Sequence, residues 1–234
     1  MEGAAAQRAL EALRASPRPR VLFVSHRFGG GVRRHIDDLV ELLEDDADVL
    51  LLHPWNGTHA RLCELSGDAE LELAFDLARD WDAMVDVLAA LGIARVHFHH
   101  VHEWPERVLG LPRSLGAPCF VTLHDYFPAC AGYHLTDGHG RYCGGEPGCM
   151  RCDDGRTPQW PLRPAQWRAR FGPWLEAAAR VIAPSSDCAR TVARFFPRAR
   201  VYTWPHPERE SADPTRVRRV LVPGGISGKG PARA

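Results

Sequence analysis

The chain has 234 residues, and its 29 basic and 29 acidic side chains cancel at neutral pH. That balance excludes a global positive field of the kind that draws proteins onto nucleic acid, so we expect no nucleic-acid partner. Hydrophobic residues make up 45% and charged residues 25%, values typical of a globular protein with a sizeable core. No apolar run approaches the roughly 18 residues of a membrane-spanning helix, and the alanine-rich start resembles neither a signal peptide nor an anchor. We therefore expect a cytoplasmic protein whose seven cysteines are reduced thiols or metal ligands.

Strand and helix signals alternate along most of the chain. Short apolar runs predict strands at 20–25, 48–53, 95–100, 118–123, 180–183 and 200–204. Helical spacing of apolar residues predicts helices at 32–43, 75–91, 106–115, 165–179 and 185–196. Because strands separated by helices form βαβ units, the sequence predicts an α/β fold with a mainly parallel, Rossmann-like sheet covered by helices on both faces.

Composition divides this pattern into segments. Residues 1–19 form an N-terminal helix or extension, and residues 20–210 form the Rossmann-like domain, with a cysteine-containing loop insertion at about 126–160. A polar, proline-containing stretch follows, as is typical of domain linkers. Residues 211–234 then hold the linker and one strand signal, at 217–222. Since one strand cannot form a core, we expect residues 211–234 to be the truncated start of a second domain.

A glycine loop joins the first predicted strand to the first helix of the domain. Its residues are Gly29, Gly30 and Gly31. Such a loop suits phosphate binding, because glycine lets the backbone approach an anion and the N–H groups of the helix start stabilise negative charge. Arg33 and Arg34 could add positive charge, although arginines in a first helical turn are more often solvated. A dinucleotide fingerprint is disfavoured, since Arg34 replaces its third glycine and no acidic residue follows the second strand.

Histidines gather around the third predicted strand, at positions 97, 99, 100 and 102. Strand alternation sends His97 and His99 to one face and His100 to the other. We therefore favour hydrogen-bonded strand-end histidines over a metal cluster.

His124 and Asp125 follow the fourth predicted strand. The carboxyl ends of parallel strands form the ligand crevice of such sheets, which makes this pair the candidate catalytic residues. The histidine could hydrogen-bond a sugar hydroxyl or a phosphate, and the carboxylate could fix its surroundings or accept from a polyol. The alternative is a simple turn after the strand.

The loop insertion contains Cys130, Cys143, Cys149 and Cys152, spaced C-x12-C-x5-C-x2-C. Four thiolates could complete a structural zinc site with no open position, ahead of free thiols, a redox pair or an iron–sulfur cluster. The other cysteines are interpreted as small hydrophobic residues. Trp160, Trp167 and Trp174 follow at seven-residue spacing, which favours a helix face packed on the core over a carbohydrate-binding platform.

Taken together, these motifs resemble the N-terminal domain of a GT-B glycosyltransferase of the large retaining family 4. The resemblance covers nearly all of residues 20–230. It is carried by FGGGVRRHIDDLVELL, by VHFHH with the later TLHDYFPAC, and by ARVIAPSSDCARTVARFFP. The cysteine loop resembles a subset of these transferases often found in bacterial polysaccharide synthesis.

The resemblance implies transfer of a sugar from a nucleotide-sugar donor to a glycan or lipid-linked acceptor, without a redox cofactor. The implied substrate-binding residues are Gly29, Gly30, Gly31, Arg33, His99, His100 and Lys229, and His124 would approach the transferred sugar. Departure of the leaving diphosphate would be assisted by its own phosphate, so no protein nucleophile is required. Lys229 matches the lysine of the family's diphosphate-binding pair, whereas the arginine of that pair and two downstream glutamates have no counterpart here.

Because the arginine and the two glutamates have no counterpart, we expect a chain that is inactive alone and pairs with a separate donor-binding domain. A rival interpretation is a non-catalytic module that binds carbohydrate or a partner protein through the same crevice. A third is a zinc-stabilised interaction domain that uses the cysteine loop. Because many relatives act on lipid-linked acceptors, peripheral contact with the inner face of a membrane is part of the expectation.

Overall fold

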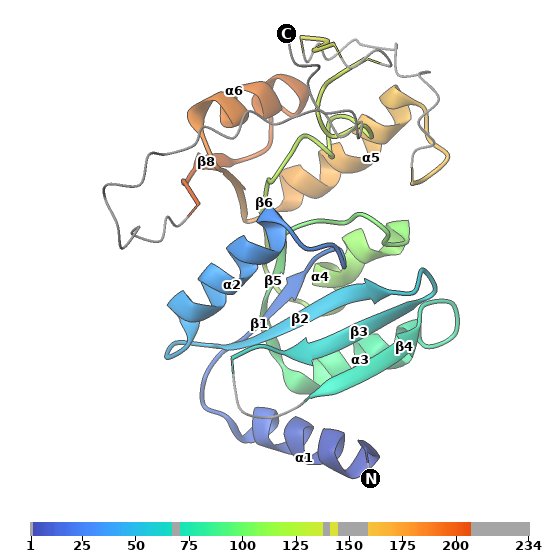
Figure 1. The fold of residues 1–234 in the computed structure, drawn as a ribbon, viewed down its shortest axis with the longest axis vertical. Coiled ribbons are helices and arrows are strands. Elements are labelled where there is room, and N and C mark those ends of the chain that lie inside the picture. The colour runs from blue at the N-terminus through green and yellow to red at the C-terminus, as the bar shows by residue number, and fades with distance from the viewer. Residues whose placement is uncertain (1, 67–70, 138–140, 145–158, 207–234) are drawn as a thin grey trace, which may run out of the picture.

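The computed structural model describes residues 2–66, 71–137, 141–144 and 159–206 (Figure 1). Lys229, Cys149, Cys152 and the strand expected at 217–222 lie outside the described residues. None of the described helices is long and apolar enough to cross a bilayer.

One sheet organises the described part of the chain, with the strand order β4-β3-β2-β1-β5-β6-β7-β8. The strands are β1 (Arg20–Val24), β2 (Asp48–Trp55), β3 (His59–Glu64), β4 (Glu72–Asp76), β5 (Ile93–Phe98), β6 (Cys119–Thr122), β7 (Arg180–Ala183) and β8 (Val201–Thr203). In this order, each pair of neighbours in the run β2-β1-β5-β6-β7-β8 is parallel. The mainly parallel α/β sheet predicted from the sequence is confirmed.

Helices cover both faces of this sheet. They are α1 (Glu2–Ala15), α2 (Gly31–Leu43), α3 (Trp81–Leu91), η1 (Glu106–Gly110), α4 (Leu111–Ser114), α5 (Pro164–Ala177) and α6 (Ser186–Phe195). Alternation along β1 sends Leu22 and Val24 into the core shared with α1, α3 and α5. Val21 and Phe23 point the other way, into a smaller core beneath α2. Both faces of the central strands are therefore buried, which explains their continuous apolar sequence.

The edge beyond β2 differs from the expectation. The helix expected at 75–91 begins only at Trp81, because β3 and β4 form antiparallel strands before it. A turn at Asn56 and Gly57, with φ angles of 48° and 79°, joins β2 to β3. Asn-Gly is the strongest short hairpin signal in a sequence, because both residues tolerate positive φ. The helix expected at 106–115 is also divided, into the 3-10 turn η1 and the single turn α4 that contains Pro112.

Indole N–H groups donate hydrogen bonds to backbone carbonyls of the loops at the carboxyl edge of the sheet. Trp104 donates from Nε1 to the carbonyl of Ser25 at 2.8 Å, and Trp160 donates to the carbonyl of Trp104 at 3.0 Å. Trp167 donates to the carbonyl of Phe127 at 2.7 Å. All three indoles are buried, so packing rather than a carbohydrate platform accounts for them. Trp160 precedes α5, however, so the tryptophans do not share one helix face as expected.

We expect Trp104→Phe to lower the free energy of unfolding by about 1–3 kcal/mol, because it leaves the buried carbonyl of Ser25 without its donor. Trp174→Phe is the matched control, since the buried Nε1 of Trp174 has no hydrogen-bond partner within the described structure. Its loss should be clearly smaller. Urea unfolding of the two variants measures the difference, and equal losses would contradict the role given to the Trp104 hydrogen bond.

Candidate functional site

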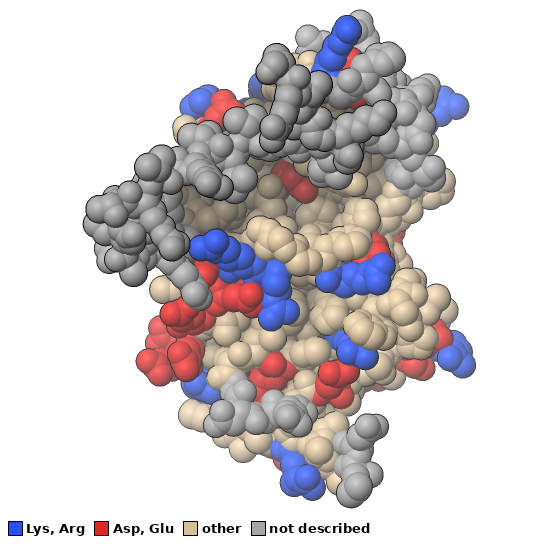
Figure 2. Space-filling view, viewed as in Figure 1, with Lys and Arg blue, Asp and Glu red and all other residues tan. Residues whose placement is uncertain are grey.

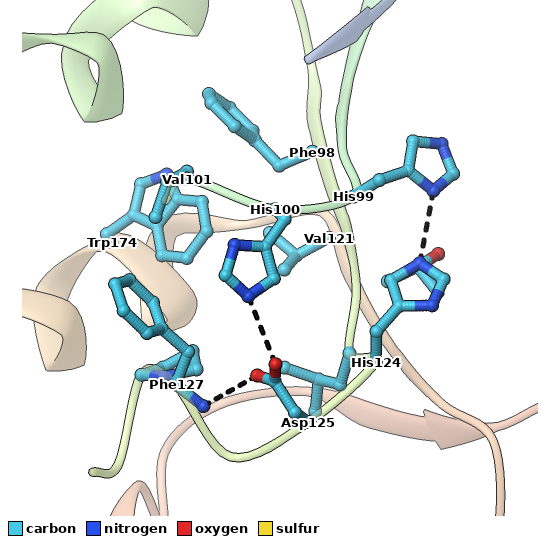
Figure 3. A pocket seen from close by; sticks show the side chains of 12 residues that line it. Phe98, His99, His100, Val101, Val121, His124, Asp125, Phe127 and Trp174 are labelled. Atoms are coloured by element: carbon cyan, nitrogen blue, oxygen red, sulfur yellow. Dashed lines mark hydrogen bonds and ion pairs between the residues drawn. The ribbon is translucent and has the colours of Figure 1, made fainter. Parts of the chain in front are cut away.

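Three neighbouring strands end at the same edge of the sheet and place polar side chains there. His26 follows β1, His99 and His100 follow β5, and His124 follows β6. The parallel register brings these strand ends together, as the sequence analysis expected of a ligand crevice. Figure 3 shows that His99 points toward His124, and His100 toward Asp125, across this edge.

Side-chain contacts connect the end of β5 to the end of β6 in three successive steps. Each pair is separated by 25 residues in sequence. The pairs are His97 Nε2 with Thr122 Oγ1 at 2.8 Å, His99 Nδ1 with His124 Nε2 at 3.4 Å, and His100 Nε2 with Asp125 Oδ2 at 3.1 Å. The third pair lies on the opposite face from the first two, as strand alternation predicted.

The contacts of His100 determine where its proton lies. His100 Nδ1 accepts the backbone N–H of His102 at 2.9 Å, so the neutral ring carries its proton on Nε2 and donates it to Asp125. The other oxygen of Asp125 accepts the N–H of Phe127 at 2.8 Å. Both carboxylate oxygens of Asp125 are thus engaged within the two loops (Figure 3). This geometry favours Asp125 as a positioning residue rather than as a base.

A second group of histidines lies on the other side of these loops. His35 from α2, His99 and His124 each present a ring nitrogen within 4.8 Å of those of the other two. The ring of His206, three residues beyond β8, lies 4.2 Å from that of His35 and 5.0 Å from that of His124, between centroids. The ring of His97 stacks on that of His99 at 4.4 Å. We call His35, His99, His124 and His206 the histidine cluster.

Burial keeps these imidazoles neutral. Desolvation, reinforced by neighbouring histidines, lowers the pKa of His124 to about 2 and that of His35 to about 4. The same causes hold the pKa of His99 well below its ordinary value, and burial lowers that of His206. Neutral imidazoles exchange hydrogen bonds with hydroxyl groups but offer no positive charge to a phosphate. Of the two ligands considered for His124, a sugar hydroxyl fits the structure better.

The glycine loop precedes α2 and opens beside this edge. Gly30 is the N-cap of α2, with φ 84° and ψ −150°, a conformation essentially restricted to glycine. A Cβ atom added at Gly29, Gly30 or Gly31 would meet no atom within 4 Å, so there is open space beside the backbone of this loop. Nearby Arg33 forms an exposed ion pair with Asp37 at 2.7 Å. Phosphate binding by this loop remains a prediction.

Two cysteines of the loop insertion are described. Cys130 is buried and Cys143 is half-buried, both as free thiols. The N–H of Cys143 donates to the carbonyl of Leu135 at 2.8 Å, beside a short antiparallel bridge between Thr136 and Tyr142. Because Cys149 and Cys152 lie outside the described residues, the structural zinc site also remains a prediction.

The remaining cysteines resemble core residues. Burial raises the pKa of the Cys119 thiol to about 12 and that of Cys188 to about 11, and it also raises the pKa of Cys63. These thiols stay protonated, in agreement with their interpretation as small hydrophobic side chains.

Sequence reasoning missed two members of the histidine cluster. His35 lies one turn into α2, next to the buried Ile36, on the face that covers the sheet. His206 lies three residues beyond β8, close to the polar, proline-containing stretch at the end of the domain. The rule that identified His99, looking at the carboxyl ends of parallel strands, would also have identified His206.

Acid should destabilise the fold through these histidines. Their ordinary pKa is 6.5, and the folded values are lower, so below pH 6.5 the unfolded chain binds more protons than the folded one. The free energy of unfolding should therefore fall as the pH decreases from 7.5 to 5.5, by about 1.4 kcal/mol per pH unit for each fully buried histidine below pH 6.5. Urea midpoints across this range measure it.

His97→Gln should reduce that pH dependence, because burial lowers the pKa of His97 to about 3 and the variant removes its contribution. Stability that stays constant or rises on acidification would contradict the burial of neutral imidazoles.

Comparison with known proteins assigns the fold to a family. A family model described as Glycosyltransferase Family 4 matches residues 29–207, roughly three quarters of the chain. A search of curated proteins finds no match. The matched region begins in the glycine loop and includes every member of the histidine cluster. The chain therefore belongs to glycosyltransferase family 4.

Proposed function

We propose that the chain serves to transfer a sugar from a nucleotide-sugar donor to a glycan or lipid-linked acceptor, in the synthesis of a bacterial surface polysaccharide. One observation carries the proposal: in a family 4 chain, the glycine loop and the ends of β5 and β6 meet at one edge of a parallel sheet. Such an edge is where α/β folds bind their ligands. The crevice would form the acceptor side of the site.

His124 is the residue best suited to contact the transferred sugar. Its ring is neutral and lies at the end of β6, so it can accept a hydrogen bond from a hydroxyl group or donate one. Asp125, the next residue of the same loop, is held in place by the hydrogen bond that His100 donates to it. Acceptor hydroxyls would thus meet a polar surface that is already ordered before binding.

Negative charge from the donor would be received at the start of α2. The N–H groups of the first helical turn lack intrahelical partners, and the helix dipole adds partial positive charge there. Basic side chains lie over the first half of α2 and acidic ones over its second half (Figure 2). This distribution would stabilise the departing diphosphate electrostatically, which is how retaining transfer without a protein nucleophile would proceed.

Further elements of the proposal lie beyond the described residues. Lys229 and a separate donor-binding domain would complete the diphosphate site, and zinc bound by the four loop cysteines would stabilise the insertion. With a lipid-linked acceptor, the protein would work in the cytoplasm in peripheral contact with the inner membrane.

The deciding experiment measures transfer of radiolabelled sugar from a panel of uridine and guanosine diphosphate sugars to glycan and polyprenyl-linked acceptors. It is run with the chain alone and with a family 4 donor-binding domain added. Labelled product in either arm supports the proposal. Acceptor binding with no transfer in both arms would instead support the non-catalytic binding module.

His124→Ala should lower kcat/KM for sugar transfer by about 100-fold or more, because it removes the polar group closest to the proposed reaction centre. His102→Ala is the matched control: His102 belongs to the same crevice but lies outside the histidine cluster, so its loss should change kcat/KM only a few-fold. Equal effects of the two substitutions would argue against a special role for His124.

Gly30→Ala should weaken donor binding, because the positive φ at Gly30 is costly for any other residue, by about 1–3 kcal/mol. The strain would displace the N–H groups at the start of α2. Gly29→Ala tests the same loop without this strain, since its φ is not positive and the space around it is open. We expect KM for the donor to rise in Gly30→Ala and to stay near the wild-type value in Gly29→Ala.

A further inference from the structure

We propose that His35, His99 and His124 bind one divalent transition-metal ion at the carboxyl edge of the sheet, with the ring of His206 packed beside them. This site is separate from the zinc expected in the cysteine loop, and neither the family match nor the proposed sugar transfer assigns it. The class of ion follows from the donors: imidazole nitrogens suit zinc, cobalt, nickel and copper, whereas calcium and magnesium require oxygen.

The distances between the ring nitrogens support a metal site. His99 Nδ1 and His124 Nε2 are 3.4 Å apart, longer than a good N–H hydrogen bond. Two nitrogens bound tetrahedrally to zinc, at about 2.0–2.1 Å each, are separated by about 3.4 Å. The nitrogens of all three residues lie within 4.8 Å of one another, so rotation of the rings on their Cβ atoms would close the remaining contacts.

An unsatisfied polar atom gives a second, independent indication. His35 Nδ1 is buried and has no hydrogen-bond partner in the described part of the chain. Leaving such an atom unpaired costs about 1–3 kcal/mol, so native structures rarely tolerate it. A bound cation would accept the imidazole lone pair of His35, and it would account for the gathering of these histidines.

The surroundings favour a cation over an anion. Asp38 is buried one turn after His35 on α2, and its negative charge acts on that ring. A buried negative charge beside the cluster favours a cation there and disfavours an anion. Imidazole nitrogens are also common ligands of transition-metal ions.

The three ligands come from α2 and from the segments that follow β5 and β6, which are far apart in sequence. One ion would therefore join the helix that carries the glycine loop to both strand ends of the crevice. Occupancy would fix the relative positions of these elements in the absence of any sugar.

Cobalt serves as the probe, because its visible spectrum distinguishes nitrogen ligands from thiolates. The full chain is stripped with a chelator and titrated with Co²⁺ without substrates, both as wild type and as the double variant Cys149→Ser/Cys152→Ser. We expect the double variant to retain one bound ion whose spectrum shows d–d bands and no thiolate-to-cobalt charge transfer. Loss of all tight binding in the double variant would overturn the proposal.

Substitutions then assign the ligands. In the Cys149→Ser/Cys152→Ser background, His35→Gln and His124→Gln should each weaken cobalt binding at least tenfold. His102→Gln, the control within the same crevice, should leave the affinity within twofold of that background. An equal loss in His102→Gln, or unchanged affinity in both cluster variants, would overturn the assignment. Circular dichroism checks that each variant is folded.

A measurement without cluster substitutions covers the case in which the variants fail to fold. In wild-type protein labelled with ¹⁵N-histidine, Zn²⁺ should shift the ring nitrogens of at least three histidines besides any change at the cysteine loop. Ring signals that remain unchanged at saturating zinc would overturn the proposal.

Discussion

The parallel register of β1, β5 and β6 is the constraint on which the rest of the structure depends. Parallel strands in register end together, so the residues that follow them share one edge. Here those residues include His99 and His124, on which His35 of helix α2 packs. The low pKa values of His99 and His124 are therefore a consequence of topology, because the fold removes the rings from water and places like groups beside one another.

The loops at this edge are held by direct polar contacts more than by regular secondary structure. Trp104 joins the segment after β5 to the end of β1, and Trp167 joins α5 to the segment after β6. The pair of His100 and Asp125 adds a third connection. These contacts order the loops without a ligand, which is how a rigid sheet supports a binding site on its connections.

Much of the fold could be predicted from the sequence, because apolar strands followed by amphipathic helices have few alternatives. The strand at Arg180–Ala183 was found where expected, and the helix after it agrees within one residue at each end. The antiparallel strands β3 and β4 were missed, since partly exposed edge strands lack a continuous apolar run. For the site, strand ends identified His99 and His124. The approach of His35 depends on how α2 packs on the sheet, and local sequence does not encode that packing distance.

Among the described strands, β8 is the last; it has only three residues and lies at the edge of the described sheet. Because β8 forms few backbone hydrogen bonds with its neighbour, it should open locally. Its amide hydrogens should therefore exchange with solvent well before those of the central strands. His206 follows only three residues later and packs on His35 and His124. Whatever immobilises that ring also restrains β8. Hydrogen exchange at this edge strand would thus report events in the crevice, as a sensor built into the weakest part of the sheet.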